Sequence, residues 1–209
     1  DEQALADFNK AIGLDPNYAQ AYANRALVYR HLNKLDLALA DYDKALRLDA
    51  SYAPAYLGRG TVYRLQHNAV QSLADFNKVI ALRPNDSEAY YDRGLLYQSQ
   101  GQHQFAINDF STAIGLTPQR EELYVVRALS YLAVNDNKSA AGDLDRAVQL
   151  NSSDPKAWAS RGLAYERLGQ KDKAAGSYAK ALNINNKYQP AVAGFARVGG
   201  EVGKAYQTF

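Results

Sequence analysis

The sequence predicts an all-α protein in which helical hairpins are stacked in a linear array. A large aromatic residue recurs every 34 residues through most of the chain, in the column Tyr22, Tyr56, Tyr90, Tyr124 and Trp158. Arginine and a small residue recur at the same interval, in the columns Arg25, Arg59, Arg93, Arg127, Arg161 and Ala26, Gly60, Gly94, Ala128, Gly162. Repeats of ~20 to 50 residues are typical of supersecondary units that stack because none can bury its apolar face alone. We therefore expect function on a surface of the array rather than in one deep pocket.

Each repeat is expected to contain two amphipathic helices joined by a tight turn. In the first complete repeat, Tyr22, Ala26 and Tyr29 share one face at helical spacing, and a second apolar set follows between Leu35 and Leu48. Proline ends several units because it disfavours helix in the residue before it. The pattern predicts the second helix of a truncated repeat at 1–14, hairpins at 19–52, 53–86, 87–120, 121–154 and 155–188, a capping helix at 189–198 and a flexible tail at 199–209.

Two further columns predict how closely the helices pack. The small column of the first helices is expected to face Ala38, Ser72, Ala106, Ala140 and Ala174 on the second helices. This pairing lets the two backbones approach to the short end of the ~8 to 10 Å range of interaxial distances. A bulky column on the second helices is expected to wedge between one hairpin and the next, and its members are Phe8, Tyr42, Phe76, Phe110, Leu144 and Tyr178.

Composition argues against several functional classes. The chain has 24 Lys and Arg against 22 Asp and Glu, and the net charge of +2 is too small to indicate a polyanionic partner. No stretch approaches the ~18 apolar residues of a membrane span, so no membrane insertion is expected. The chain has no cysteine, and the cytoplasm and the bacterial periplasm both stay open as its compartment. Residues 1–17 match only the second half of a repeat, so we expect an upstream segment, with any targeting signal, to be missing.

A 34-residue hairpin with aromatic and small residues on the first helix, then alanine, an aromatic and proline on the second, resembles the tetratricopeptide repeat. Runs such as Gly58-Arg59-Gly60 resemble the arginine-glycine variety that is common in bacterial members. The resemblance covers residues 1 to about 188 and implies a right-handed α-solenoid, a superhelix of hairpins. Departures are local; Ala50, for example, stands where the terminal proline is expected.

No residue pattern points to catalysis, a cofactor or a metal. His31, His67 and His103 lie in successive hairpins, which are offset by roughly 10 Å, whereas the ligands of one zinc ion each lie ~2.0 to 2.1 Å from it. The run GGEVGK at 199–204 lacks the strand, the spacing and the hydroxyl residue of a phosphate-binding loop. We therefore expect a non-enzymatic protein without a cofactor.

The arginine column needs partners, because charge inside a repeat core is costly unless it is paired. A second column keeps the same interval: Asp7, Asp41, Asp75, Asp109 and Asp143, with Ser177 in the sixth place. Bonding to the aspartate eighteen residues earlier, on the preceding hairpin, matches every arginine. Bonding within the hairpin, sixteen residues later, would leave Arg161 facing Ser177. We therefore predict a structural ladder of ion pairs between hairpins.

The resemblance implies that the first helices line a concave inner groove. The candidate peptide-groove residues lie beside the packing face of these helices: Leu27, Arg30, Leu57, Arg64, Tyr91, Leu95, Val125, Val126, Leu129, Leu132 and Leu163. The leucines that share one repeat position fit half burial between neighbouring first helices equally well. The predicted centre is Tyr91 with Val125 and Val126, where a large ring and branched aliphatic side chains are expected off the packing face.

These residues predict a scaffold that binds a peptide or a helical segment of a protein partner. The groove is close to neutral and lacks the basic stripe that nucleic acid requires. It also lacks the lysines, asparagines and arginine with which chaperone-binding members grip a terminal carboxylate. The groove positions here hold Ala23, Leu27, Gly58, Glu88 and Asp92. The alternative that stays open is an architectural role, in which the array self-associates or holds a larger assembly together.

Overall fold

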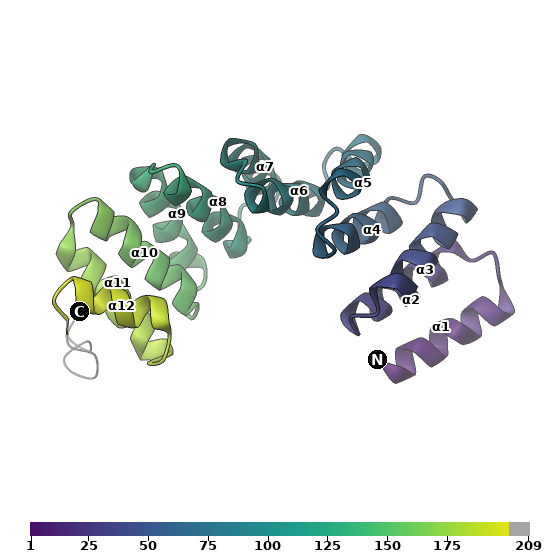
Figure 1. Cartoon of the computed structure of the whole chain (residues 1–209), viewed down its shortest axis with the longest axis horizontal. Helices are drawn as coiled ribbons and strands as arrows, with labels where there is room; N and C mark the ends of the chain where they lie inside the picture. The colour runs from purple at the N-terminus through teal and green to yellow at the C-terminus, as the bar shows by residue number, and fades with distance from the viewer. Residues whose placement is uncertain (201–209) are drawn as a thin grey trace. The chain divides into compact units, whose positions relative to one another are not determined.

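The structure is a computed structural model that describes residues 1–200, and within them the chain forms twelve α-helices and no strand (Figure 1). In chain order the helices are α1 (Glu2–Leu14), α2 (Ala19–His31), α3 (Leu35–Leu48), α4 (Ala53–Leu65), α5 (Ala69–Leu82), α6 (Ser87–Ser99), α7 (His103–Leu116), α8 (Glu121–Ala133), α9 (Asn137–Leu150), α10 (Pro155–Arg167), α11 (Lys171–Ile184) and α12 (Gln189–Arg197). None of them is long and apolar enough to cross a membrane. Residues 201–209 of the predicted tail lie outside the described residues. The predicted all-α fold of consecutive helical hairpins is confirmed.

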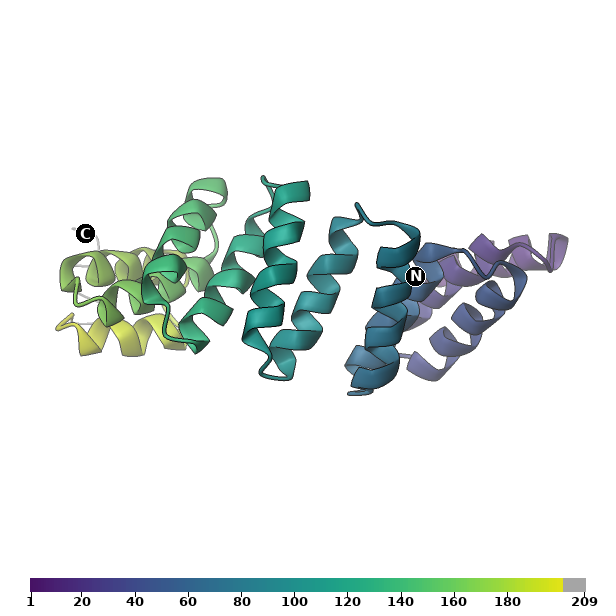
Figure 2. The same ribbon diagram turned by 90° about the horizontal axis from the view of Figure 1, so that it is seen from above.

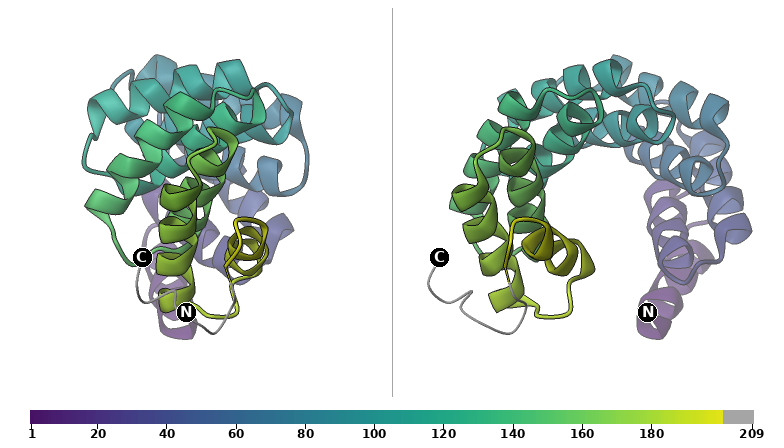
Figure 3. Two further views of the ribbon diagram at one scale, coloured as in Figure 1. Left: turned by 90° about the vertical axis from the view of Figure 1, so that its left-hand side faces the viewer. Right: turned by 60° about the vertical axis from the view of Figure 1, so that its left-hand side comes forward.

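The chain divides into two compact units, and the boundary falls inside α6, between Leu96 and Tyr97. In the first unit α1 packs on α2, hairpin α2–α3 packs on hairpin α4–α5, and the first helices α2 and α4 also touch directly. In the second unit α8, α10 and α12 form a similar row of first helices. Consecutive helices of each unit run back and forth (Figure 2), and α12, in yellow, lies against the hairpin before it (Figure 3). The first helices of each unit therefore form a continuous face.

A left-handed residue at one repeat position makes the turn of each hairpin. Asn33, His67 and Asn135 have φ angles of 58°, 59° and 61°, and Gly101 and Gly169 have φ angles of 73° and 75°. Glycine and asparagine enter this region of backbone conformation more readily than most residues. His67 therefore has a place in the turn, because it occupies the same repeat position as the two asparagines and has the same left-handed backbone conformation.

The 34-residue aromatic column fastens the loop between consecutive hairpins. In each repeat the polar group of the ring donates to the carbonyl oxygen six residues earlier, at 2.8 or 2.9 Å, and the donors are Tyr22, Tyr56, Tyr90, Tyr124 and Trp158. Trp158 fits this column because its indole N–H donates as the tyrosine hydroxyl does. The position therefore requires a ring that carries a donor.

The small column brings the helices of a hairpin close together, as expected. Across hairpin α4–α5 the hydroxyl of Ser72 donates to the carbonyl oxygen of Gly60 at 2.7 Å. A Cβ on Gly60 would press against the ring of Phe76. Ala26 and Ala38, the corresponding residues of hairpin α2–α3, are completely buried. Close approach of the two helices is what excludes larger residues here.

The predicted ladder of ion pairs between hairpins is wrong. The aspartates bond the arginine of their own hairpin through two hydrogen bonds of 2.6 to 2.9 Å, in the pairs Arg25–Asp41, Arg59–Asp75 and Arg127–Asp143. The expected partner of Arg59, Asp41, is instead bonded to Arg25. In the last hairpin Arg161 donates to the hydroxyl of Ser177 at 2.7 Å, so serine satisfies the position too.

The arginines do bridge consecutive hairpins, but through another column. The second bond of each arginine reaches the residue sixteen places earlier, and these acceptors are Asn9, Asp43, Asn77, Ser111 and Asp145. Asp41 and Asp43 are two residues apart and point ~200° apart around α3. Asp41 therefore faces its own α2, while Asp43 faces α4 of the next hairpin. The prediction of an aspartate ladder between hairpins failed because the residues that form the bridge are aspartate, asparagine or serine. A search for a column of aspartates therefore did not find them. The hydrogen bonds that Arg59 donates to Asp75 and Asp43 raise the pKa of Arg59, which stays charged.

Candidate functional site

A cavity of about 270 Å³ lies on the first-helix face of the first unit. It is lined by Ala23, Asn24, Leu27 and Arg30 of α2, Tyr42 of α3, Tyr52, Pro54, Leu57, Gly58 and Thr61 of α4 and the loop before it, and Glu88 and Asp92 of α6. The charged side chains are Arg30 at one side and Glu88 with Asp92 at the other. The cavity therefore offers an apolar middle between a positive and a negative side.

Tyr42 enters this cavity from the second helix of its hairpin. Its ring is only 2 % exposed, and it passes into the first-helix layer beside Gly58, where a Cβ would collide with the ring and the hydroxyl. Burial raises the pKa of Tyr42, and the positive charge of Arg30 lowers it in part. Among the described residues the hydroxyl has no hydrogen-bond partner, and the guanidinium of Arg30 has no bond or ion pair. Both groups thus line the cavity without bonding another described residue, and the Tyr42 hydroxyl stays accessible to solvent there.

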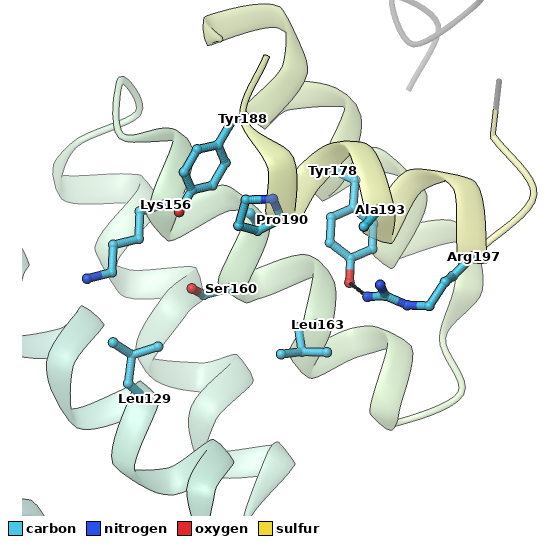
Figure 4. A pocket seen from close by; sticks show the side chains of 10 residues that line it. Leu129, Lys156, Ser160, Leu163, Tyr178, Tyr188, Pro190, Ala193 and Arg197 are labelled. Carbon is cyan, nitrogen blue, oxygen red and sulfur yellow. Dashed lines mark hydrogen bonds between the residues drawn. The ribbon is translucent and has the colours of Figure 1, made fainter. Parts of the chain in front are cut away.

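A second cavity, of about 330 Å³, lies between α8, α10 and α12 of the second unit (Figure 4). It is lined by Leu129, Lys156, Ala159, Ser160, Leu163, Tyr178, Tyr188, Pro190, Ala193 and Arg197. Tyr178 enters it from α11 beside Gly194, since a Cβ on Gly194 would collide with the ring. Figure 4 shows Lys156 and Arg197 at opposite ends of the cavity.

The polar groups of the second cavity bond one another. The hydroxyl of Tyr178 donates to the Glu166 carboxylate at 2.5 Å, and Arg197 donates to the same carboxylate at 2.9 and 3.1 Å. Arg197 also lies 3.4 Å from the Tyr178 hydroxyl (Figure 4). The hydrogen bonds from Arg197, helped by that from Tyr178, lower the pKa of Glu166. Burial and the bond to Glu166 raise the pKa of Tyr178. This network is complete without a ligand.

The two cavities occupy equivalent positions four repeats apart. The corresponding residues are Ala23 and Ala159, Asn24 and Ser160, Leu27 and Leu163, Tyr42 and Tyr178, Tyr52 and Tyr188, Pro54 and Pro190, Leu57 and Ala193, Gly58 and Gly194, and Thr61 and Arg197. At the remaining polar position Arg30 corresponds to Glu166. The same backbone design therefore carries different polar groups in the two units.

Five of the predicted groove residues line these cavities. Leu27, Arg30 and Leu57 meet in the first unit, as the groove pattern predicts for neighbouring first helices. Leu129 and Leu163 meet in the second unit. Leu27 is 38 % exposed, which leaves room for contact with a ligand.

The other predicted residues are placed less favourably. Tyr91, Leu95 and Arg64 of the first unit are partly buried and do not line its cavity. Val125, Val126 and Leu132 of the second unit are only 4 %, 9 % and 6 % exposed, so the exposed apolar surface expected of them is absent. The physical reason is packing, because Val125 and Leu132 belong to the hydrophobic core of the second unit. Gln98 donates to the carbonyl of Val126, and Arg167 to that of Leu132.

Sequence reasoning missed the tyrosines. Tyr42 and Tyr178 were assigned to a packing column, and Tyr52 and Tyr188 were not singled out. The sequence did contain one signal for these cavities. The bulky column holds tyrosine at Tyr42 and Tyr178, and glycine stands sixteen residues after each of them, at Gly58 and Gly194. Where the column holds phenylalanine or leucine, the residue sixteen places on is Asn24, Asp92, Val126 or Ser160.

Three family models described as tetratricopeptide repeat match residues 19–52, 60–130 and 125–190. Among solved structures, YrrB, described as a TPR protein with an unusual peptide-binding site, is 25% identical with a TM-score of 0.73, over 89% of this chain and 96% of that one. MamA is 25% identical with a TM-score of 0.71, over 78% and 96%. PilF of Pseudomonas aeruginosa is 18% identical with a TM-score of 0.79, over 89% and 84%. No curated protein sequence matches the chain significantly.

Proposed function

Because the chain belongs to the tetratricopeptide repeat family, we propose that it is a protein interaction scaffold that holds a polypeptide segment of its partner against α2, α4 and the first turns of α6. Proteins built from these repeats are generally interaction modules and not enzymes. The peptide-binding description of YrrB, which aligns over most of both chains, supports the same class of ligand.

The observation that carries the proposal is the first-unit cavity. Its volume of about 270 Å³ lies just below the ~300 to 1,000 Å³ typical of small-molecule sites, and it suits one or two side chains of a longer segment. Leu27 and Leu57 can supply apolar contact, and the Tyr42 hydroxyl and the Arg30 guanidinium, which bond no other described residue, can supply polar contact. An anchor residue seated in such a pocket typically provides much of the binding free energy of an interface.

The test is a selection of peptides from a random display library on the whole protein. The dissociation constant of a selected peptide is then measured by calorimetry on the parent and on Leu27→Asp. A carboxylate placed on the apolar wall should weaken binding by about tenfold or more. The matched control is Leu37→Asp, because Leu37 is a 49 % exposed leucine of the same hairpin that does not line the cavity.

Equal affinity of the selected peptides for the parent and Leu27→Asp would contradict the proposal. Loss of affinity in Leu37→Asp as large as in Leu27→Asp would contradict it as well, because binding would then lie elsewhere or follow folding. Circular dichroism of both variants separates folding from binding.

A further inference from the structure

In the second cavity the hydroxyl of Tyr178, the tyrosine that passes beside Gly194, is bonded to a carboxylate. The three polar groups of this cavity are a tyrosine hydroxyl, a guanidinium and a carboxylate, and the carboxylate of Glu166 accepts hydrogen bonds from Tyr178 and Arg197. The acceptor is therefore held by one hydroxyl and one guanidinium. Glu166 plays the part of an internal ligand for the other two.

The first cavity contains the same donors but no carboxylate bonded to them. Tyr42 takes the place of Tyr178, and the guanidinium is supplied by Arg30 from the position equivalent to Glu166. Thr61, a much smaller residue, replaces Arg197, and its hydroxyl is already bonded to the carbonyl oxygen of Leu57 at 3.0 Å. Both donors are unsatisfied among the described residues, and Tyr42 is 98 % covered by protein.

The Tyr42 hydroxyl is open to the cavity, so a ligand seated there can bond it in place of water. Its position also depends on Gly58, which gives up helix propensity so that the ring can pass. Phenylalanine stands at the equivalent position in two other hairpins, Phe76 and Phe110, so packing alone does not require the hydroxyl. The hydroxyl of Tyr42 is thus better explained by contact with a ligand.

We propose that the first cavity selects partner segments by an acidic side chain, Asp or Glu, whose carboxylate is bound by the Tyr42 hydroxyl and the Arg30 guanidinium. The inference rests on the proposed function, because it names the residue type by which the bound segment is recognised. A charge-assisted bond to each donor satisfies both at once, and such bonds are roughly twice as strong as neutral ones.

The negative side of the cavity restricts the ligand further. Glu88 and Asp92 come from α6, whereas Arg30 comes from α2, with α4 between them. A second carboxylate close to the first would find no second positively charged group among the described residues that line the cavity. A terminal Asp or Glu, which carries two carboxylates, fits this charge pattern worse than one acidic side chain inside an otherwise apolar segment.

The test uses peptides from the display selection. Each peptide is synthesised in two forms that differ at one position, with Asp or Glu in the acidic form and Asn or Gln in the amide form. We expect the selected peptides to share one acidic residue. Replacing that residue by Gln or Asn should weaken binding to the parent protein by about tenfold. The same replacement should have almost no effect on Arg30→Gln, because the charge it loses has no partner there. The control Arg47→Gln removes an exposed arginine of α3 outside the cavity and should keep the tenfold preference.

Tyr42→Phe separates the hydroxyl from the ring. This variant keeps the apolar wall, and it should lose about three- to tenfold in affinity for the acidic peptide and nothing for the amide peptide. An amidated and a free C-terminus are compared on each peptide. A requirement for the free terminus would overturn the assignment to a side chain.

The outcomes distinguish the two proposals. Selected peptides that are weakened by Leu27→Asp but bind equally with acid and amide would overturn this inference and leave the proposed function standing. Enrichment of Lys or Arg in place of an acidic residue would overturn it in favour of recognition by Glu88 and Asp92. Peptides that do not distinguish Leu27→Asp from the parent would overturn the proposed function itself.

Discussion

The two cavities share a backbone design and differ in their polar groups. Each is entered by a tyrosine from the second helix, which passes beside a glycine of the next repeat, and each has a tyrosine and a proline at the following loop and helix start. In the second unit Glu166, Tyr178 and Arg197 satisfy one another. In the first unit Tyr42 and Arg30 do not. One repeat architecture therefore carries both a cavity whose polar groups bond one another and a cavity whose tyrosine and arginine bond no other described residue.

The largest effect is expected from the glycines that both cavities share. Gly58→Ala and Gly194→Ala should each lower the free energy of unfolding by about 1 to 3 kcal/mol, because the added methyl group overpacks the tyrosine ring. Gly142→Ala, on a helix surface with open space around it, should stabilise by up to about 1 kcal/mol instead. Thermal and urea denaturation measure all three variants. Unchanged stability of Gly58→Ala would break the comparison, because the tyrosine would not need its glycine.

Exchange of the polar groups tests whether they alone distinguish the cavities. The double variant Glu166→Arg with Arg197→Thr gives the second cavity the groups of the first, and it should gain affinity for acidic peptides by about tenfold. Titration of a selected acidic peptide into a protein already carrying Arg30→Gln isolates this new site. No gain in a folded double variant would show that apolar differences such as Leu57 against Ala193 decide the specificity.

Removal of the two hydroxyls should affect stability unequally. Tyr178→Phe breaks the bond to Glu166 and should cost about 1 to 2 kcal/mol, because the hydroxyl bonds a charged group. Tyr42→Phe should be neutral or slightly stabilising without ligand, since the lost hydroxyl had no partner. Equal losses in chemical denaturation would contradict the contrast between a satisfied and an unsatisfied site.

The smallest expected effect is the pH dependence of the stability that Glu166 contributes. Arg197 lowers the pKa of Glu166 in the folded protein, so Glu166 stabilises the fold above its ordinary unfolded pKa and loses that contribution as pH falls through the lower folded pKa. The stability difference between the parent and Glu166→Gln should be under about 1 kcal/mol at pH 7, because the pair is partly exposed, and should shrink toward pH 3. A difference that grows on acidification would have the wrong sign.

The repeat allowed the helices to be predicted, whereas the polar contacts depended on facts that periodicity does not contain. A column at helical spacing identifies the face on which a residue lies, and so the hairpins and the meeting of Leu27 with Leu57 were predictable. The partner of an arginine depends on the rotation of the facing helix, which placed Asp43, and not Asp41, toward Arg59. Burial of Val125 and Val126 likewise depends on side chains from outside their own helix.

The tyrosine of α3 and the glycine of α4 belong to different repeats, although they build one cavity. A repeat that is copied, deleted or moved as a block therefore carries half of one pocket and half of another. New specificity in such a chain requires coordinated change on both sides of a repeat junction, and an engineer who grafts this pocket should transfer the chain from α2 to the first turns of α6 as one piece.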